Sequence, residues 1–134
     1  MILSVKTRER TELIDITSNI NQLIQKSGVD QGLCMLYVPH TTAAVTINES
    51  ADPSVKSDIL MILNHIIPWE ANYRHLEGNS AAHIKSTLVG PSELIAIEKR
   101  RLSLGTWQGI FFCEFDGPRT RKVNVRIMEE RFAK

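Results

Sequence analysis

Residues 74–90 hold the densest group of side chains in this sequence that could do chemistry. The stretch reads RHLEGNSAAHIKSTLVG and contains two of the chain's four histidines, His75 and His83, with Glu77 and Asn79 between them. Imidazoles that converge on one point, with a carboxylate beside them, are typical of a transition-metal site. The spacing matches no strong zinc motif. Ordinary hydrogen-bonding roles for both histidines therefore remain open.

His40 is the third histidine that we consider functional. It follows the apolar run GLCMLYV and a proline, so the end of a buried strand would hold its side chain in a fixed position. The hydroxyls of Thr41 and Thr42 can orient a phosphate, a water or the imidazole itself. We predict His40, His75 and His83 as metal ligands, with zinc or magnesium as the cofactor. A hydrogen-bonded turn after the proline is the structural alternative for His40.

Two carboxylates lie where the next strand leads into a helix. Glu49 and Asp52 stand close together in the segment INESADP, after Asn48. Such a pair can hold a divalent cation or act as acid and base. We predict His40, Glu49 and Asp52 as catalytic residues and Asn48 as a substrate contact. Asp52 also fits a purely structural role as a helix cap.

The C-terminal third adds side chains that suit a phosphorylated ring. Trp107 can form a flat wall for a ring, although a packed core aromatic is equally consistent with the sequence. Arg119 and Arg121 alternate on one predicted strand, so they share a face. Paired guanidinium groups suit phosphate oxygens, and solvated arginines remain the alternative. The predicted substrate contacts are Thr41, Thr42, Asn48, Asn79, Trp107, Gln108, Arg119 and Arg121.

The elements that must position these residues follow from hydrophobic periodicity. Apolar side chains recur at helical spacing in three stretches, each bounded by capping or helix-breaking residues. We predict helices over 18–27, from Asp52-Pro53 to Pro68, and over 80–88. The expected N-terminal caps of these helices are, in order, Thr17 or Ser18, Asp52, and Asn79 or Ser80. Gly28 is expected to end the first helix.

Strand-like runs fill most of the remaining chain, at 2–10, 32–38, 93–97, 106–115 and 120–128. The run 32–38 is apolar throughout, which predicts a strand covered on both faces. Asp116-Gly117-Pro118-Arg119 is a turn sequence that predicts a hairpin between the last two strands.

The length, composition and net charge of the chain fit one ordinary globular domain. The chain has 134 residues, 43% of them hydrophobic, and a net charge of +1, so no bulk electrostatic attraction to nucleic acid or membrane is expected. No signal peptide or membrane span is apparent, and Cys34 and Cys113 lie in apolar runs, as reduced thiols of a cytoplasmic protein would. We predict a single α+β domain over residues 1–134, with a largely antiparallel sheet or sandwich and two to three helices.

Three long segments of the chain resemble the YjbQ family, also described as secondary thiamine-phosphate synthase-type proteins. They are PHTTAAVTINESADPSV, YRHLEGNSAAHIKSTLVG and GTWQGIFFCEFDGPRTRKV, and their order and spacing cover nearly the full length. The resemblance implies a sandwich-like homotrimer with polar clefts near subunit boundaries. It maps the family's polar signature onto His40, Thr41, Thr42, Asn48, Glu49, Asp52, His75, Glu77, Asn79, His83, Gln108, Glu114 and Arg119, without assigning their roles.

The resemblance also implies an activity: joining hydroxymethylpyrimidine diphosphate to thiazole phosphate with release of pyrophosphate. Such an enzyme is our first hypothesis, with a metal or arginines holding the diphosphate. A metal-dependent hydrolase of a phosphorylated small molecule is the second. The third is a trimer that binds a small anion or metabolite without turnover.

Overall fold

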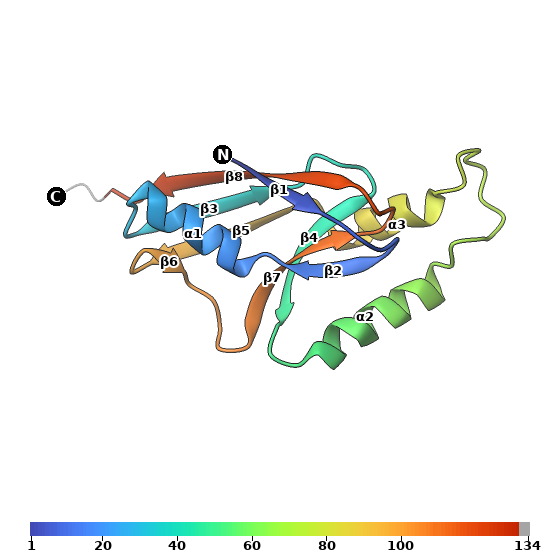
Figure 1. Cartoon of the computed structure of the whole chain (residues 1–134), viewed down its shortest axis with the longest axis horizontal. Coiled ribbons are helices and arrows are strands. Elements are labelled where there is room, and N and C mark those ends of the chain that lie inside the picture. Colours follow the sequence, from blue (N-terminus) through green and yellow to red (C-terminus); the bar gives the residue numbers. More distant parts are fainter. Residues whose placement is uncertain (132–134) are drawn as a thin grey trace.

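A computed structural model describes residues 1–131, in which two antiparallel sheets and three helices form one domain (Figure 1). The predicted α+β class is confirmed, and the last three residues of the predicted domain, 132–134, lie outside the described residues. The strands are β1 (Ile2–Lys6), β2 (Glu12–Asp15), β3 (Gly32–Tyr37), β4 (Ala43–Glu49), β5 (Ser92–Glu98), β6 (Arg101–Leu102), β7 (Gln108–Glu114) and β8 (Thr120–Glu129). The helices are α1 (Thr17–Ser27), α2 (Pro53–Ile66) and α3 (Ser80–Val89).

The five-stranded sheet has the order β1-β8-β3-β5-β6, and the three-stranded sheet has the order β2-β7-β4. Strand alternation places Leu36, Val123 and Phe112 in the core shared by the two sheets. Within the single chain, the prediction that 32–38 is covered on both faces is wrong: buried and exposed residues alternate along β3. Its outward side chains Leu33 and Tyr37 are apolar but lie open on the surface of this single chain.

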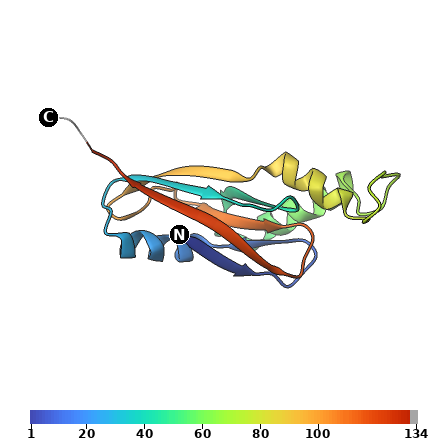
Figure 2. The ribbon, with the colours of Figure 1, turned by 90° about the horizontal axis from the view of Figure 1, so that it is seen from above.

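The helices cover different parts of this framework. Ile20 and Ile24 of α1 are fully buried in the core shared by the sheets. Leu63 of α2 and Ala82 of α3 instead pack with Phe111 on the other face of the three-stranded sheet. Both views of the ribbon show α2 and α3 at the end of the molecule away from the C-terminus (Figures 1 and 2).

Local helix signals are confirmed at two of the predicted positions. Gly28 adopts the left-handed conformation at the C-terminus of α1, with φ of 74°. Asp52 caps α2 by accepting a hydrogen bond from the Ser54 N–H at 2.9 Å. At the start of α1, however, neither Thr17 nor Ser18 is the cap, because Asp15 accepts from the Thr17 N–H.

The turn Asp116-Gly117-Pro118-Arg119 does not close a hairpin. β7 belongs to the three-stranded sheet and β8 to the five-stranded sheet, so this turn carries the chain from one sheet to the other. The prediction of a hairpin is wrong because turn residues specify a local reversal and not which strands pair. The turn therefore lies at a corner where both sheets meet.

Cys34 and Cys113 are buried free thiols, as predicted. Burial raises the pKa of Cys34 to about 11 and that of Cys113 to about 12. Both therefore stay protonated at neutral pH and pack as small apolar side chains. Within residues 1–131, no helix is both long and apolar enough to cross a bilayer.

Candidate functional site

A polar hollow of about 500 Å³ opens where the β3–β4 loop, the start of α3 and the β7–β8 turn meet. It brings together eight of the predicted site residues, His40, Thr41, Thr42, His75, Asn79, His83, Arg119 and Arg121. Pro39, Glu77 and Asp116 complete its lining. The convergence of the three histidines on one hollow thus agrees with the sequence analysis.

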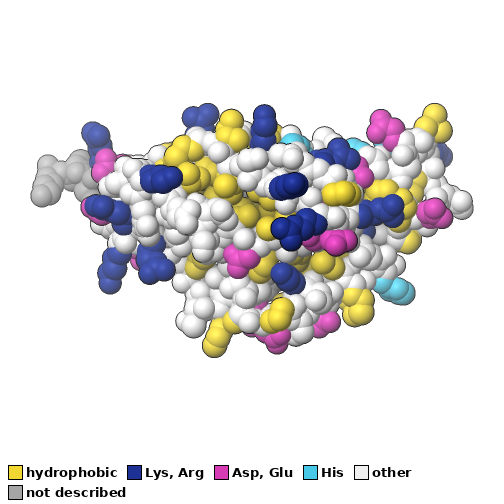
Figure 3. Space-filling model, viewed as in Figure 1, with side chains coloured by type: hydrophobic (Ala, Val, Ile, Leu, Met, Phe, Trp, Pro, Cys, Tyr) yellow, Lys and Arg dark blue, Asp and Glu magenta, His cyan; other side chains and the backbone are white. Residues whose placement is uncertain are grey.

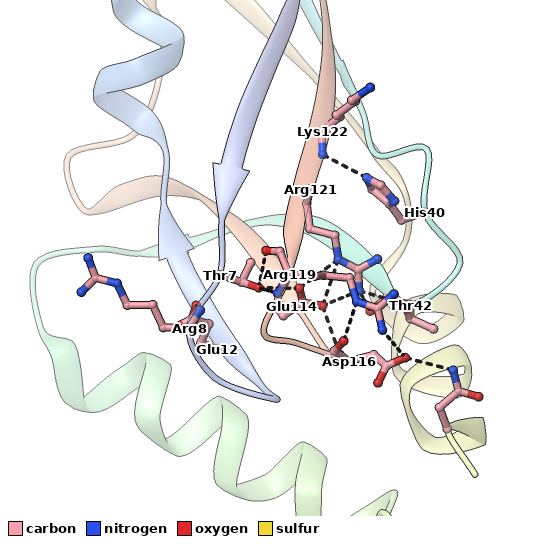
Figure 4. Close-up of polar contacts among 11 residues, drawn as sticks. Thr7, Arg8, Glu12, His40, Thr42, Glu114, Asp116, Arg119, Arg121 and Lys122 are labelled. Atoms are coloured by element: carbon pink, nitrogen blue, oxygen red, sulfur yellow. Dashed lines mark hydrogen bonds and ion pairs between the residues drawn. The ribbon is translucent and has the colours of Figure 1, made fainter. Parts of the chain in front are cut away.

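Arg121 forms the floor of the hollow. Its side chain is 3% exposed, and its guanidinium lies against the carboxylate of Glu114, whose side chain is fully buried. Arg121 Nε donates to Glu114 Oε1 at 2.9 Å, and Nη2 donates both to Glu114 Oε2 and to Thr42 Oγ1 (Figure 4). Such a bidentate pair fixes the plane of the guanidinium. The side chain is therefore rigid before any ligand arrives.

The carboxylate of Glu114 is satisfied from several sides. The hydroxyl of Thr7 donates to Oε1 at 2.8 Å, and the Asp116 N–H donates to Oε2 at 3.1 Å. Burial by itself raises the pKa of Glu114, but the hydrogen bonds from Arg121, Asp116 and Thr7 outweigh burial and lower it. The ion pair is thus present at neutral pH.

His40 is oriented by the backbone of β8. The Lys122 N–H donates to Nε2 of His40 at 3.0 Å (Figure 4). Because Nε2 accepts, the proton of the neutral ring is on Nδ1, which makes that nitrogen a donor. Burial, followed by the charge of Arg121, lowers the pKa of His40. The neutral ring with a donating Nδ1 is therefore the form at neutral pH.

Asn79 and Arg119 both bind Asp116. Nδ2 of Asn79 donates to Asp116 Oδ2 at 2.9 Å, and Nη2 of Arg119 donates to the same oxygen at 3.2 Å. Asn79 is the residue before α3, but its side chain makes no capping bond there. The side chain that was predicted as a cap or a substrate contact thus belongs to the wall of the hollow, and its amide orientation is set by Asp116.

The predicted three-histidine metal site does not fit this geometry. His75 and His83 have their ring centroids 5.4 Å apart in an edge-to-face arrangement, but the lone pair of His40 Nε2 is already engaged by the backbone. Nε2 of His75 lies 3.9 Å from Glu77, too far for a hydrogen bond. In the described part of the chain, no three His, Cys, Asp or Glu side chains are grouped to hold a metal ion.

The remaining predicted residues lie at, or just beyond, the ends of β4 and β7 that are distant from the hollow. Glu49 pairs with Gln108 across β4 and β7, whereas Ala43 pairs with Glu114 near the hollow. Six strand steps at ~3.3 Å separate these ends by about 20 Å. The structure therefore does not bring Asn48, Glu49, Asp52, Trp107 or Gln108 into the hollow of the same chain. Trp107 is 63% exposed, and Asp52 is the cap of α2.

Two residues of the site were not selected from the sequence. Thr7 lies 107 positions from Glu114 in the chain, and nothing in its local sequence signals this contact. Asp116 was interpreted only as a turn residue, although its position beside Arg119 could have indicated an ion pair. Figure 4 shows both side chains in the network that supports the hollow.

Comparisons with known proteins agree with this fold over its full length. The family model described as "UPF0047 protein YjbQ-like" matches residues 1–130. The chain is 52% identical to the UPF0047 protein YugU of Bacillus subtilis, covering 94% of this chain and 96% of that protein. It is 57% identical to the UPF0047 protein MJ1081 of Methanocaldococcus jannaschii, covering 95% and 92%.

Solved structures show the same architecture. An uncharacterised protein of the yjbq/upf0047 family from Clostridium acetobutylicum superposes with a TM-score of 0.93 at 51% identity, covering 96% of this chain and 99% of that one. A hypothetical protein from Aeropyrum pernix superposes with a TM-score of 0.92 at 39% identity, covering 97% and 98%. With matches of this extent in both sequence and structure, the chain belongs to the YjbQ/UPF0047 family.

Proposed function

We propose that this protein is a transferase of the thiamine-phosphate synthase type, joining hydroxymethylpyrimidine diphosphate to thiazole phosphate with release of pyrophosphate. The activity is the one that the family resemblance implies. The observation that supports it in this chain is Arg121, a buried guanidinium held rigid by Glu114 at the floor of a polar hollow. Pre-oriented donors of this kind suit phosphate oxygens.

The donors of the hollow act on the diphosphate. In the reaction, the bond between the pyrimidine methylene carbon and the diphosphate oxygen breaks, and its electron pair leaves with the diphosphate. The thiazole nitrogen supplies the pair for the new carbon–nitrogen bond. Arg119 and Arg121 would stabilise the charge that grows on the leaving group, and the Nδ1–H of His40 adds a neutral donor. Because these groups are fixed by Asp116, Glu114 and the β8 backbone, little reorganisation is needed.

A direct assay tests this proposal. The purified protein is incubated with both substrates and Mg²⁺, and thiamine phosphate is measured by chromatography. Arg119→Gln and His40→Gln should each lower the rate, by roughly 100-fold if one transition-state donor is lost. Lys26→Gln, at an exposed site on α1 away from the hollow, is the matched control and should behave as the wild type. No product from the wild type at high protein concentration would refute the transferase.

A non-catalytic anion-binding protein is the second candidate. Glu49 and Asp52, the carboxylates predicted to be catalytic, lie at the other end of β4 and its following loop, so within one chain they give no acid or base to the hollow. Pyrophosphate binding without any product would favour this candidate. The histidines do not support a metal-dependent hydrolase, because the predicted three-histidine metal site does not fit the geometry of the hollow.

We also propose that the homotrimer implied by the resemblance covers the open face of the five-stranded sheet. Five large apolar side chains of this face are exposed, and contiguous apolar surface of this kind is typical of an interface. They are Ile2 at 63%, Leu33 at 42%, Tyr37 at 43%, Leu94 at 61% and Met128 at 46%. Apolar residues also reach the surface on the α2 side (Figure 3), including Met61 and Ile66. Two different apolar surfaces on one chain suit a closed ring of copies.

A further inference from the structure

A second hollow, of about 440 Å³, adjoins the polar hollow. The two share His40, Thr41 and His83, so these residues form a common wall. The second hollow is completed by Ala43, Ser86, Thr87 and Pro91. The two hollows together therefore form one cleft with two compartments.

One face of α3 lines both compartments. Asn79, His83 and Thr87 follow one another at intervals of four residues, with Ser86 three residues after His83, so all four lie along one side of the helix. Asn79 belongs to the polar hollow and Ser86 to the second one, with His83 between them. A single rigid helix thus sets the distance between the compartments.

Each compartment is lined by one residue that has a buried polar atom without a partner. Within residues 1–131, the buried side-chain atoms that lack a hydrogen bond are Asn79 Oδ1 and Ser86 Oγ. Ser86 is 7% exposed, whereas the hydroxyl of its neighbour Thr87 donates to the His83 carbonyl at 2.9 Å. Burying a polar atom without a partner is unfavourable, and natural proteins do so rarely. The two exceptions in this structure both lie on the face of α3 that lines the cleft.

The side chains of the second compartment select an uncharged ligand. Its lining consists of hydroxyls, imidazoles, a methyl group and a proline ring, without Lys, Arg, Asp or Glu. The polar hollow beside it carries both arginines. A charged phosphate is thus stabilised in the first compartment only.

We propose that the second hollow binds an uncharged nitrogen heterocycle whose phosphate group occupies the polar hollow. Ser86 Oγ hydrogen-bonds a polar atom of the ring. This inference rests on the proposed transferase activity, which determines the choice of a pyrimidine diphosphate as the probe.

Calorimetric titrations with two probes test the assignment. Binding of pyrophosphate measures the affinity of the polar hollow alone, and binding of hydroxymethylpyrimidine diphosphate measures the affinity of both compartments together. Both titrations are done in the presence of Mg²⁺. The pyrimidine compound should bind the wild type more tightly than pyrophosphate. Ser86→Ala should weaken its binding roughly three- to tenfold, the effect of one lost hydrogen bond. Ser86→Val, which also narrows the compartment, should weaken it further.

Pyrophosphate binding should be unchanged in both Ser86 variants, since the polar hollow is intact. Ser27→Ala is the matched control: it removes a serine hydroxyl on α1 that donates to the Ile24 carbonyl, outside both hollows, and it should leave the preference for the ring in place. Equal weakening of both probes in the Ser86 variants, or a wild type that binds the two probes equally, would overturn the assignment. Thermal unfolding shows whether each variant is folded.

The outcomes separate this inference from the proposed function. A preference for the ring that depends on Ser86, together with no thiamine phosphate in the assay, would refute the transferase and retain the second compartment. Product formation with Ser86 variants that bind and react as the wild type would retain the transferase and refute the compartment.

Discussion

Arg121 and Glu114 form a buried ion pair that joins the two sheets. Glu114 is the last residue of β7 in the three-stranded sheet, and Arg121 lies in β8 of the five-stranded sheet. Their side chains are 0% and 3% exposed, respectively. The same pair therefore holds the corner of the sandwich together and fixes the floor of the polar hollow.

Glu114→Gln should destabilise the protein strongly, because it leaves the Arg121 guanidinium buried without a countercharge. Breaking a buried pair in this way costs about 3–5 kcal/mol in the free energy of unfolding. Urea unfolding at pH 7 measures the loss. The double variant Glu114→Gln/Arg121→Met, which removes both charges, should recover part of it. A single variant within ~0.5 kcal/mol of the wild type would show that the pair does not stabilise the fold.

The carboxylate of Glu114 should also make the free energy of unfolding fall in acid. Because the folded-state pKa of Glu114 is lowered, the unfolded chain binds more protons below its ordinary value of 4.5. The contribution of Glu114 is fully present above pH 4.5 and is lost as the pH falls toward the lowered folded value. The free energy of unfolding should therefore fall less steeply below pH 4.5 in Glu114→Gln than in the wild type. Parallel slopes in the two proteins would contradict this.

The sequence predicted many of the residues that line the hollow, but it did not show which of the other candidates lie far from it. His75, Asn79 and His83 are close in the chain, and a turn followed by a helix necessarily keeps them together. The separation of Trp107 from Arg121 could not be predicted, because Trp107 precedes β7 and Arg121, in β8, contacts Glu114 at the other end of β7. The Glu114–Arg121 pair depends on β7 and β8 lying in different sheets, which the local turn sequence does not specify.

His40 should titrate below its ordinary pKa of 6.5, because burial and the charge of Arg121 disfavour the imidazolium. Protonation also removes the lone pair that accepts from the Lys122 N–H. Between the lowered value and 6.5 the unfolded chain binds more protons, so this group makes stability rise with pH through that window. Nitrogen NMR of the ring should show a proton on Nδ1 at pH 7.5. A proton on Nε2 would contradict the assigned tautomer.

Lys85 of α3 is a buried cation that is bonded to a neutral amide. It is 2% exposed, and its Nζ donates to Asn64 Oδ1 at 2.6 Å. Burial, with a smaller effect of the Arg10 charge, lowers the pKa of Lys85. We therefore expect Lys85→Met to be neutral or to stabilise the protein at pH 7, by up to ~4 kcal/mol, since the buried charge is replaced by a side chain of similar volume.

The pH dependence of this variant provides the check. Between the lowered folded pKa and the ordinary value of 10.5, the unfolded chain binds more protons at Lys85, so stability from this group rises with pH. The difference between wild type and Lys85→Met should thus shrink as the pH is raised from 7 to 10 in urea unfolding. A large destabilisation at pH 7 would show instead that the Lys85–Asn64 hydrogen bond is worth more than the cost of burying the charge.

The open apolar face predicts that assembly depends on the outward residues of β3 and β5. Met35 and Leu94 face each other across these strands, and Leu94 is 61% exposed in the single chain. Leu94→Glu places a carboxylate where the proposed trimer excludes water, and burying an unpaired charge is strongly unfavourable. Light scattering after gel filtration should show trimers for the wild type and smaller species for Leu94→Glu. Lys26→Glu, a charge change at an exposed site on α1, is the control and should remain trimeric. A Leu94→Glu variant that still forms trimers would show that the subunits associate through another surface.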